Sequence, residues 1–199
     1  ILYEDNHIIA AYKPAGILSQ GDETGEDSML EMVKKYIKEK YKKEGNVFLG
    51  LVHRLDRPVS GIMIFAKTSK GASRVSEQFR NHEVEKTYHA VVFGKMDRKK
   101  GIIVSHLRKD EDRNKVFVHQ SASGDTKESE LSYEVIESNN KYSLLKIKPL
   151  TGRSHQIRAQ LSSIGHPIVG DVKYGAPKSL PDHSIMLRAT ELIFRMATS

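Results

Sequence analysis

The sequence contains no cysteine in 199 residues. This excludes disulfides, thiolate nucleophiles and thiolate metal ligands, and it fits a cytoplasmic protein. The nine histidines include no HxxxH pair, so zinc is not expected. A GxGxxG motif and a P-loop are also absent, so no nucleotide cofactor is expected. We therefore expect a protein that works without a metal or a cofactor.

Long apolar runs are absent too: no stretch approaches the ~18 residues of a membrane-spanning helix. The sequence starts at Ile1 without a methionine or a signal pattern, which favours the interior of a longer chain or a trimmed one. The net charge of +7 and the pI near 9.4 indicate a polyanionic partner such as nucleic acid. The length allows one sizeable core or two small lobes, and we expect one monomeric domain over residues 1–199.

Asp56 lies in the run HRLDRPVSG, residues 53–61, between two arginines and ahead of the apolar run 62–66. An apolar run bounded by turn residues predicts a buried strand, so the acid is expected on a loop that enters the core. Neighbouring guanidiniums favour the ionised carboxylate. An ionised, oriented carboxylate can act as a nucleophile or a base. The alternative is a structural salt bridge within the loop.

The run 53–61 resembles the catalytic motif of the RluA family of pseudouridine synthases, which isomerise uridine to pseudouridine in ribosomal or transfer RNA. Other family motifs are matched in the family's order by residues 13–16 with 20–22, 85–90, 150–158, and 165–171 with 174–175. These matches span nearly the whole chain. The resemblance implies a single catalytic domain with a central sheet and a cleft across it, and this chain has no room for the additional S4-type domain of some members.

By this resemblance, Asp56 is the catalytic aspartate, Tyr88 the active-site tyrosine, and Arg158 the partner that forms an ion pair with Asp56. The tyrosine ring could stack on uracil and its hydroxyl could take part in proton transfer. The carboxylate could attack the sugar or the base, or abstract a ribose proton, and the sequence does not choose among these routes. A core-packed strand tyrosine is the alternative for Tyr88.

Further residues are candidates for RNA contact. The resemblance implies that Arg54 enters the space left by a flipped uridine, and that Leu187 lies against the uracil. The chain reads Leu187-Arg188-Ala189 where the family pattern has histidine in the middle. Lys13 could meet a phosphate, although a turn lysine is usually solvated. At an expected helix start, exposed N–H groups favour a phosphate, which adds Arg153, His155 and Gln156.

The periodicity predicts an α+β fold with a mixed, mostly antiparallel sheet and no doubly wound parallel sheet. The expected helices are 28–43, 70–81 and 154–163, the first with a capping box at Ser28 and Glu31 and a lysine-rich face that is solvated or in contact with RNA. Hairpin connections are expected at 94–101 and 137–141, and a polar loop at 121–127. The expected strands are 1–3, 8–11, 47–52, 62–66, 88–93, 102–106, 115–119, 130–136, 143–147 and 185–194.

Two other functions remain open at this point. One is an RNA-binding protein on the same fold without catalysis, against which the combination of Asp56, Tyr88 and Arg158 argues. The other is a glycoside hydrolase, which usually needs two carboxylates across the bond, whereas no second acid recurs in the motif regions. Without an S4-type domain, a compact stem-loop such as a transfer RNA arm is the favoured substrate.

Overall fold

The computed structural model describes residues 1–22 and 25–196. The chain divides into two compact units, which we call unit 1 (residues 1–84 and 192–199) and unit 2 (residues 85–191). Each unit is a small lobe, which is one of the two organisations that the length of the chain allows. The prediction of one domain over 1–199 stays a prediction, and its last three residues lie outside the described residues.

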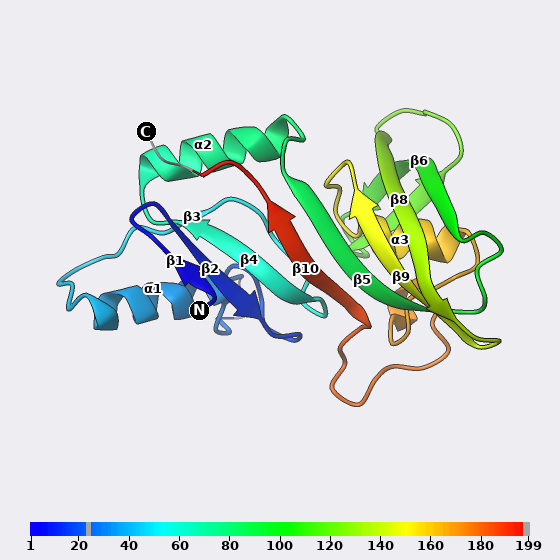
Figure 1. The fold of residues 1–199 in the computed structure, drawn as a ribbon, viewed down its shortest axis with the longest axis horizontal. Helices are drawn as coiled ribbons and strands as arrows, with labels where there is room; N and C mark the ends of the chain where they lie inside the picture. Colours follow the sequence, from blue (N-terminus) through cyan, green and yellow to red (C-terminus); the bar gives the residue numbers. More distant parts are fainter. Residues whose placement is uncertain (23–24, 197–199) are drawn as a thin grey trace. The chain divides into compact units, whose positions relative to one another are not determined.

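Unit 1 contains a small antiparallel sheet in the order β1, β2, β4, with β3 also paired to β4 (Figure 1). Its helices begin at N-caps whose side chains accept a backbone N–H: Ser28 from Glu31 and Thr68 from Gly71. The elements are β1 Tyr3–Glu4, β2 Ile8–Lys13, α1 Met29–Lys40, β3 Gly50–Leu51, β4 Ser60–Ala66 and α2 Ser69–Arg80.

The core of unit 1 lies on both faces of this sheet. Ile8, Ile64 and Val75 are buried together, so α2 packs on the face that carries alternate residues of β2 and β4. Ile9 and Phe65, which face each other in the β2–β4 register, are completely buried on the opposite face. Burial on both faces explains why β4 is a continuous apolar run and not an alternating one.

Unit 2 is built on longer strands in the order β10, β5, β9, β8, β6, β7, with antiparallel β5–β9, β9–β8, β8–β6 and β6–β7 pairs. The helix α3, Gln156–Ser163, and the short 3₁₀ helix η1, Val172–Tyr174, complete it. The chain leaves this unit within β10, after Glu191. The strands are β5 Glu85–Phe93, β6 Lys100–Asp110, β7 Lys115–His119, β8 Lys127–Ser138, β9 Tyr142–Pro149 and β10 Leu187–Ile193.

The helix α3 is buried along most of its length because it packs on the sheet of unit 2. Gln160, completely buried, donates through Nε2 to the carbonyls of Ile103 and Ser129 and to the hydroxyl of Ser105. These bonds connect α3 to β6 and β8. A helix that is buried on nearly all sides can position a polar side chain firmly.

Two details of the prediction were wrong. Residues 94–101 do not form a hairpin connection, because β9 and β10 are the neighbours of β5 and β6 lies beyond β8. The strand expected at 47–52 is reduced to β3. In both cases the local sequence pattern did not decide the outcome, because pairing with distant segments did.

The fold class is confirmed: the protein is α+β with a mostly antiparallel sheet and three α-helices among the described residues. The helices expected at 28–43 and 70–81 correspond to α1 and α2, and the hairpin at 137–141 joins β8 and β9. Within the described part of the chain, no helix is long and apolar enough to cross a membrane.

Candidate active site

Asp56 lies on the loop between β3 and β4, as the sequence predicted. The loop turns sharply after the acid, where the N–H of Val59 donates to the Asp56 carbonyl at 3.0 Å. Leu55 and Val59 are buried, whereas Asp56 is half-buried and Arg54 is exposed. The apolar side chains therefore anchor the loop, and the acid between them stays accessible from one side.

A second segment of unit 1 holds this loop through its main chain. The hydroxyl of Ser19 donates to the carbonyl of Leu55 at 2.6 Å and accepts the N–H of Leu55 at 3.0 Å. The N–H of Gly16 donates to the carbonyl of Arg57 at 2.8 Å, and Nε of Arg57 donates back to the carbonyl of Gly16 at 3.0 Å. Contacts on both sides of Asp56 fix its Cα position without using its carboxylate.

Lys13 is the third support of the loop. It is the last residue of β2 and completely buried, with Nζ donating to the carbonyls of Pro14 at 3.0 Å and Arg57 at 3.1 Å. Burial lowers its pKa to about 8; the charge of Asp56 raises it and that of Arg57 lowers it further. The alternative of a solvated turn lysine is wrong, because water does not reach this side chain.

The remaining side chains of the motif shape the loop. Nε2 of His53 accepts the N–H of Ile64 at 3.0 Å, and its ring stacks on Phe79 with centroids 4.9 Å apart. Nη2 of Arg57 forms an ion pair with Glu26 at 2.6 Å. These contacts hold the loop in shape.

In unit 2, Tyr88 lies in the middle of β5, half-buried and opposite Ile147 of β9. Side chains on either side of it connect β5 to β10. The hydroxyl of Thr87 donates to Glu191 at 2.9 Å, and Nδ1 of His89 lies 2.9 Å from the hydroxyl of Thr190. Tyr88 therefore projects from a strand whose register is fixed by side-chain bonds as well as by the ladder.

Arg158 lies on α3 and is buried together with Asp171. Its Nε donates to Asp171 Oδ2 at 2.7 Å and its Nη2 to Oδ1 at 2.9 Å, a bidentate ion pair. The guanidinium carbon lies 5.0 Å from the ring centroid of Tyr174. This geometry fixes the guanidinium plane. The ion pair of Arg158 with Asp56 expected from the sequence stays a prediction.

Tyr174 joins the start of α3 to this pair. Its hydroxyl accepts the N–H of Val116 at 2.8 Å and lies 2.8 Å from Nδ1 of His155. His155 is the N-cap of α3 in a left-handed conformation with φ of 49°. Because the hydroxyl already accepts from a backbone amide, its proton is available for the histidine nitrogen, which fits the tautomer protonated at Nε2.

The other candidates of unit 2 differ in exposure. The side chain of Gln156 is buried: Oε1 accepts from Thr151 and from the N–H of Arg153, and Nε2 donates to Glu130. Its role here is to fix the turn before α3. Arg153 is exposed, with Nε donating to the carbonyl of Glu128 at 3.2 Å. Leu187 is buried at the start of β10.

The structure thus groups the candidates within each unit: Lys13, Arg54 and Asp56 in unit 1, the others in unit 2. Sequence reasoning missed two supporting residues. Asp171 lies in the matched segment 165–171, and Ser19 directly precedes the matched residues 20–22, so position near a motif was the available signal. Among the described residues, no three histidine or acidic side chains are arranged to hold a metal ion.

Residues 7–163 match the family model described as RNA pseudouridylate synthase, and the chain belongs to this family. It is 34% identical to the dual-specificity RNA pseudouridine synthase RluA of Vibrio cholerae, over 98% of this chain and 76% of that protein. It is also 34% identical to tRNA pseudouridine synthase C of Vibrio parahaemolyticus, over 98% of this chain and 83% of the relative.

Solved structures agree with this assignment. The human RNA pseudouridylate synthase domain containing 4 superposes with a TM-score of 0.81 at 25% identity, over 97% of this chain and 83% of that one. The chain is therefore an RNA pseudouridine synthase, and RNA is its partner. The resemblance seen in the sequence is confirmed at the level of the family, the fold and the reaction.

Proposed function

We propose that Asp56 is the group on which the isomerisation depends. The observation that supports it is the mounting of its loop: main-chain bonds from Lys13, Gly16 and Ser19 hold the residues on both sides of the acid. In the reaction the N1–C1′ bond breaks and a C5–C1′ bond forms. The C5 hydrogen leaves to solvent as a proton and N1 gains one, so that the product is an isomer. The carboxylate attacks the sugar or the base, or abstracts a ribose proton.

Tyr88 and Arg158 complete the proposed machinery. The ring of Tyr88 stacks on the uracil, and its hydroxyl takes part in proton transfer. Arg158 pairs with the Asp56 carboxylate and orients it. Its bidentate bond to Asp171 supports this role, because an arginine that is already held loses little freedom when it binds a second carboxylate.

The RNA contacts follow exposure. Arg54 is exposed on the Asp56 loop, and we assign it to the gap left by the flipped uridine, where a stacked guanidinium offsets part of the unstacking cost. Arg153 and His155 precede α3 and contact the RNA backbone. Leu187 is the exception: it is buried, and its apolar contact to the uracil is proposed from the family resemblance and not from exposure. For Gln156 and Lys13 the buried side-chain bonds favour support of the site over direct contact with RNA.

Ribosomal or transfer RNA is the proposed substrate, since relatives named for both match this chain. We propose that the protein acts as a monomer in the cytoplasm, without a metal and away from membranes.

The test is tritium release from RNA labelled at uridine C5, taken from cells that lack this protein. Release reports C5–C1′ bond formation directly. We expect release by the wild type, none by Asp56→Ala, and wild-type release by Asp112→Ala, a matched loss of one exposed acid on the turn between β6 and β7 of unit 2. RNA affinity should be retained in Asp56→Ala.

Normal release by Asp56→Ala would show that another group performs the chemistry. Release by none of the proteins, with RNA binding intact, would favour the RNA-binding alternative. Fractionating the labelled RNA, and finding which fraction loses tritium to the wild type, then distinguishes ribosomal from transfer RNA.

A further inference from the structure

The helix α1 presents lysines on the side opposite its buried stripe. Met29, Val33 and Ile37 are buried and lie on one side of the helix. At about 100° per residue, Lys35 and Lys38 project from the opposite side. Both are exposed. These two positively charged side chains therefore point away from the body of unit 1.

Two more lysines, Lys42 and Lys43, follow the end of α1, and the backbone of Lys42 has an unusual conformation. The N–H of Lys42 donates to the carbonyl of Glu39, and the N–H of Lys43 to that of Lys38, which is a Schellman motif. Lys42 takes the left-handed position of this motif, with φ of 49°, where glycine is usual. The chain keeps a cation at a position where a residue without a side chain would be less strained.

In the part of the chain that the structure describes, these lysines differ from their neighbours in having no acidic partner. Lys34 forms an ion pair with Glu31, and Lys40 one with Glu4. Within residues 1–22 and 25–196, no hydrogen bond or ion pair of the other four side chains is found. We call these four the α1 lysine patch: Lys35, Lys38, Lys42 and Lys43.

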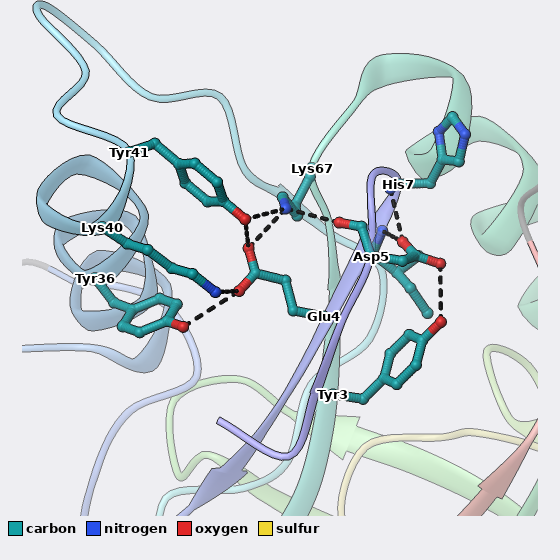
Figure 2. A network of polar contacts seen from close by, with 9 residues as sticks. Tyr3, Glu4, Asp5, His7, Tyr36, Lys40, Tyr41 and Lys67 are labelled. Carbon is teal, nitrogen blue, oxygen red and sulfur yellow. Dashed lines mark hydrogen bonds and ion pairs between the residues drawn. The ribbon is translucent and has the colours of Figure 1, made fainter.

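A polar network on the other side of α1 fixes the direction of the patch. Figure 2 shows the Glu4 carboxylate of β1 accepting Nζ of Lys40 at 2.7 Å and the hydroxyl of Tyr41 at 2.7 Å. The same carboxylate accepts Nζ of Lys67, which follows β4, at 2.6 Å. Burial raises the pKa of Glu4, but these bonds outweigh it and lower the pKa to about 2. The anchor is therefore ionised at any physiological pH.

We infer that the α1 lysine patch is a docking surface for the phosphate backbone of the substrate RNA, outside the residues that surround Asp56. Four outward cations on an anchored helix complement a polyanion, and they span about 10 Å along the helix. The inference rests on the proposed function for the identity of the substrate. The competing explanation is that the lysines only stabilise the carboxyl end of α1 through the helix dipole.

Binding of fluorescently labelled, unfractionated transfer RNA tests the patch in an Asp56→Ala background that does not turn over. The variant replaces Lys35, Lys38 and Lys42 with glutamine. Each lost phosphate contact should reduce the log–log salt slope by about 0.7, so the slope should fall by about 2 and the Kd at 0.1 M salt should rise by up to about 100-fold. The control replaces Lys95, Lys99 and Lys141, three exposed lysines of unit 2.

Equal loss of affinity in the two triple variants, or an unchanged slope in the α1 variant, would overturn the inference. Lys42→Gly separates docking from helix stabilisation. A docking role predicts a Tm no lower than the parent's and a Kd about fivefold higher at 0.1 M salt. A dipole role predicts a lower Tm and an unchanged Kd, and that result would also overturn the inference.

Tritium release by the triple α1 variant with Asp56 intact keeps the two proposals distinguishable. Docking predicts a raised KM with kcat near that of the wild type. If the wild type releases no tritium, the proposed function fails, whereas the salt slope still decides whether the patch binds RNA.

Discussion

Asp56 in unit 1 and Arg158 in unit 2 are held in opposite ways. The Asp56 loop is bound through its main chain, by Ser19 at Leu55 and by Lys13 at Arg57. Arg158 is held through its side chain, by a bidentate ion pair with the buried Asp171. Main-chain support fixes where a residue lies and leaves its functional group available. Side-chain support fixes the functional group itself, which suits a residue that orients another and does not react.

The largest effect should come from breaking the side-chain support. Asp171→Ala leaves the guanidinium of Arg158 buried without its partner, and we expect a loss of about 3–5 kcal/mol in the free energy of unfolding. Urea unfolding monitored by circular dichroism measures it. A loss under about 1 kcal/mol would mean that water reaches the ion pair in solution or that its geometry differs there.

A double variant separates stability from function. Replacing Arg158 by methionine and Asp171 by leucine removes both charges, and such exchanges are often neutral or stabilising. We expect it to recover most of the stability lost in Asp171→Ala. If Arg158 orients Asp56, this double variant should release no tritium although it is stable. Release at the wild-type rate would exclude that role.

The effect of breaking the main-chain support should be smaller. Ser19→Ala removes a buried hydroxyl and leaves both the carbonyl and the N–H of Leu55 without it, at a cost of about 1–3 kcal/mol. With Asp56 intact, kcat should fall because the acid is less well placed. Ser132→Ala is the control, since its hydroxyl makes a single 3.4 Å bond at the surface. Equal kcat values for the two variants would argue against a role of the Ser19 hydroxyl in placing Asp56.

Lys13 gives this support a pH dependence. Its folded-state pKa of about 8 lies below the ordinary value of 10.5, so between these values the unfolded chain binds more protons and stability rises with pH. From pH 7.5 to pH 9.5, the free energy of unfolding of the wild type should rise by about 1–2 kcal/mol relative to that of Lys13→Met, after allowance for screening. Guanidinium unfolding at both pH values measures this difference. A constant difference would mean that Lys13 titrates normally.

The sequence predicted the positions of the motifs better than their supports. It placed Asp56 on a loop before β4 because an apolar run after turn residues is a local signal. It did not reveal that Asp171 pairs with Arg158, because the pair is 13 residues apart and depends on how the segment after α3 returns along β5. Burial also depends on distant residues. The sequence around Lys13 is typical of a turn, but its side chain is buried and donates to the carbonyl of Arg57 in the Asp56 loop.

The smallest effect is expected where the Asp56 loop is supported by side chains. Arg57 and Glu26 form an ion pair at 2.6 Å, but both side chains are about half exposed, 49% and 48%. Water screens such a pair, so Glu26→Gln should cost less than about 1 kcal/mol, and 1 M salt should remove the difference from the wild type. Unfolding at low and high salt measures it. A salt-resistant loss above about 2 kcal/mol would show that the loop depends on this pair, and the contrast between main-chain support in unit 1 and side-chain support in unit 2 would no longer hold.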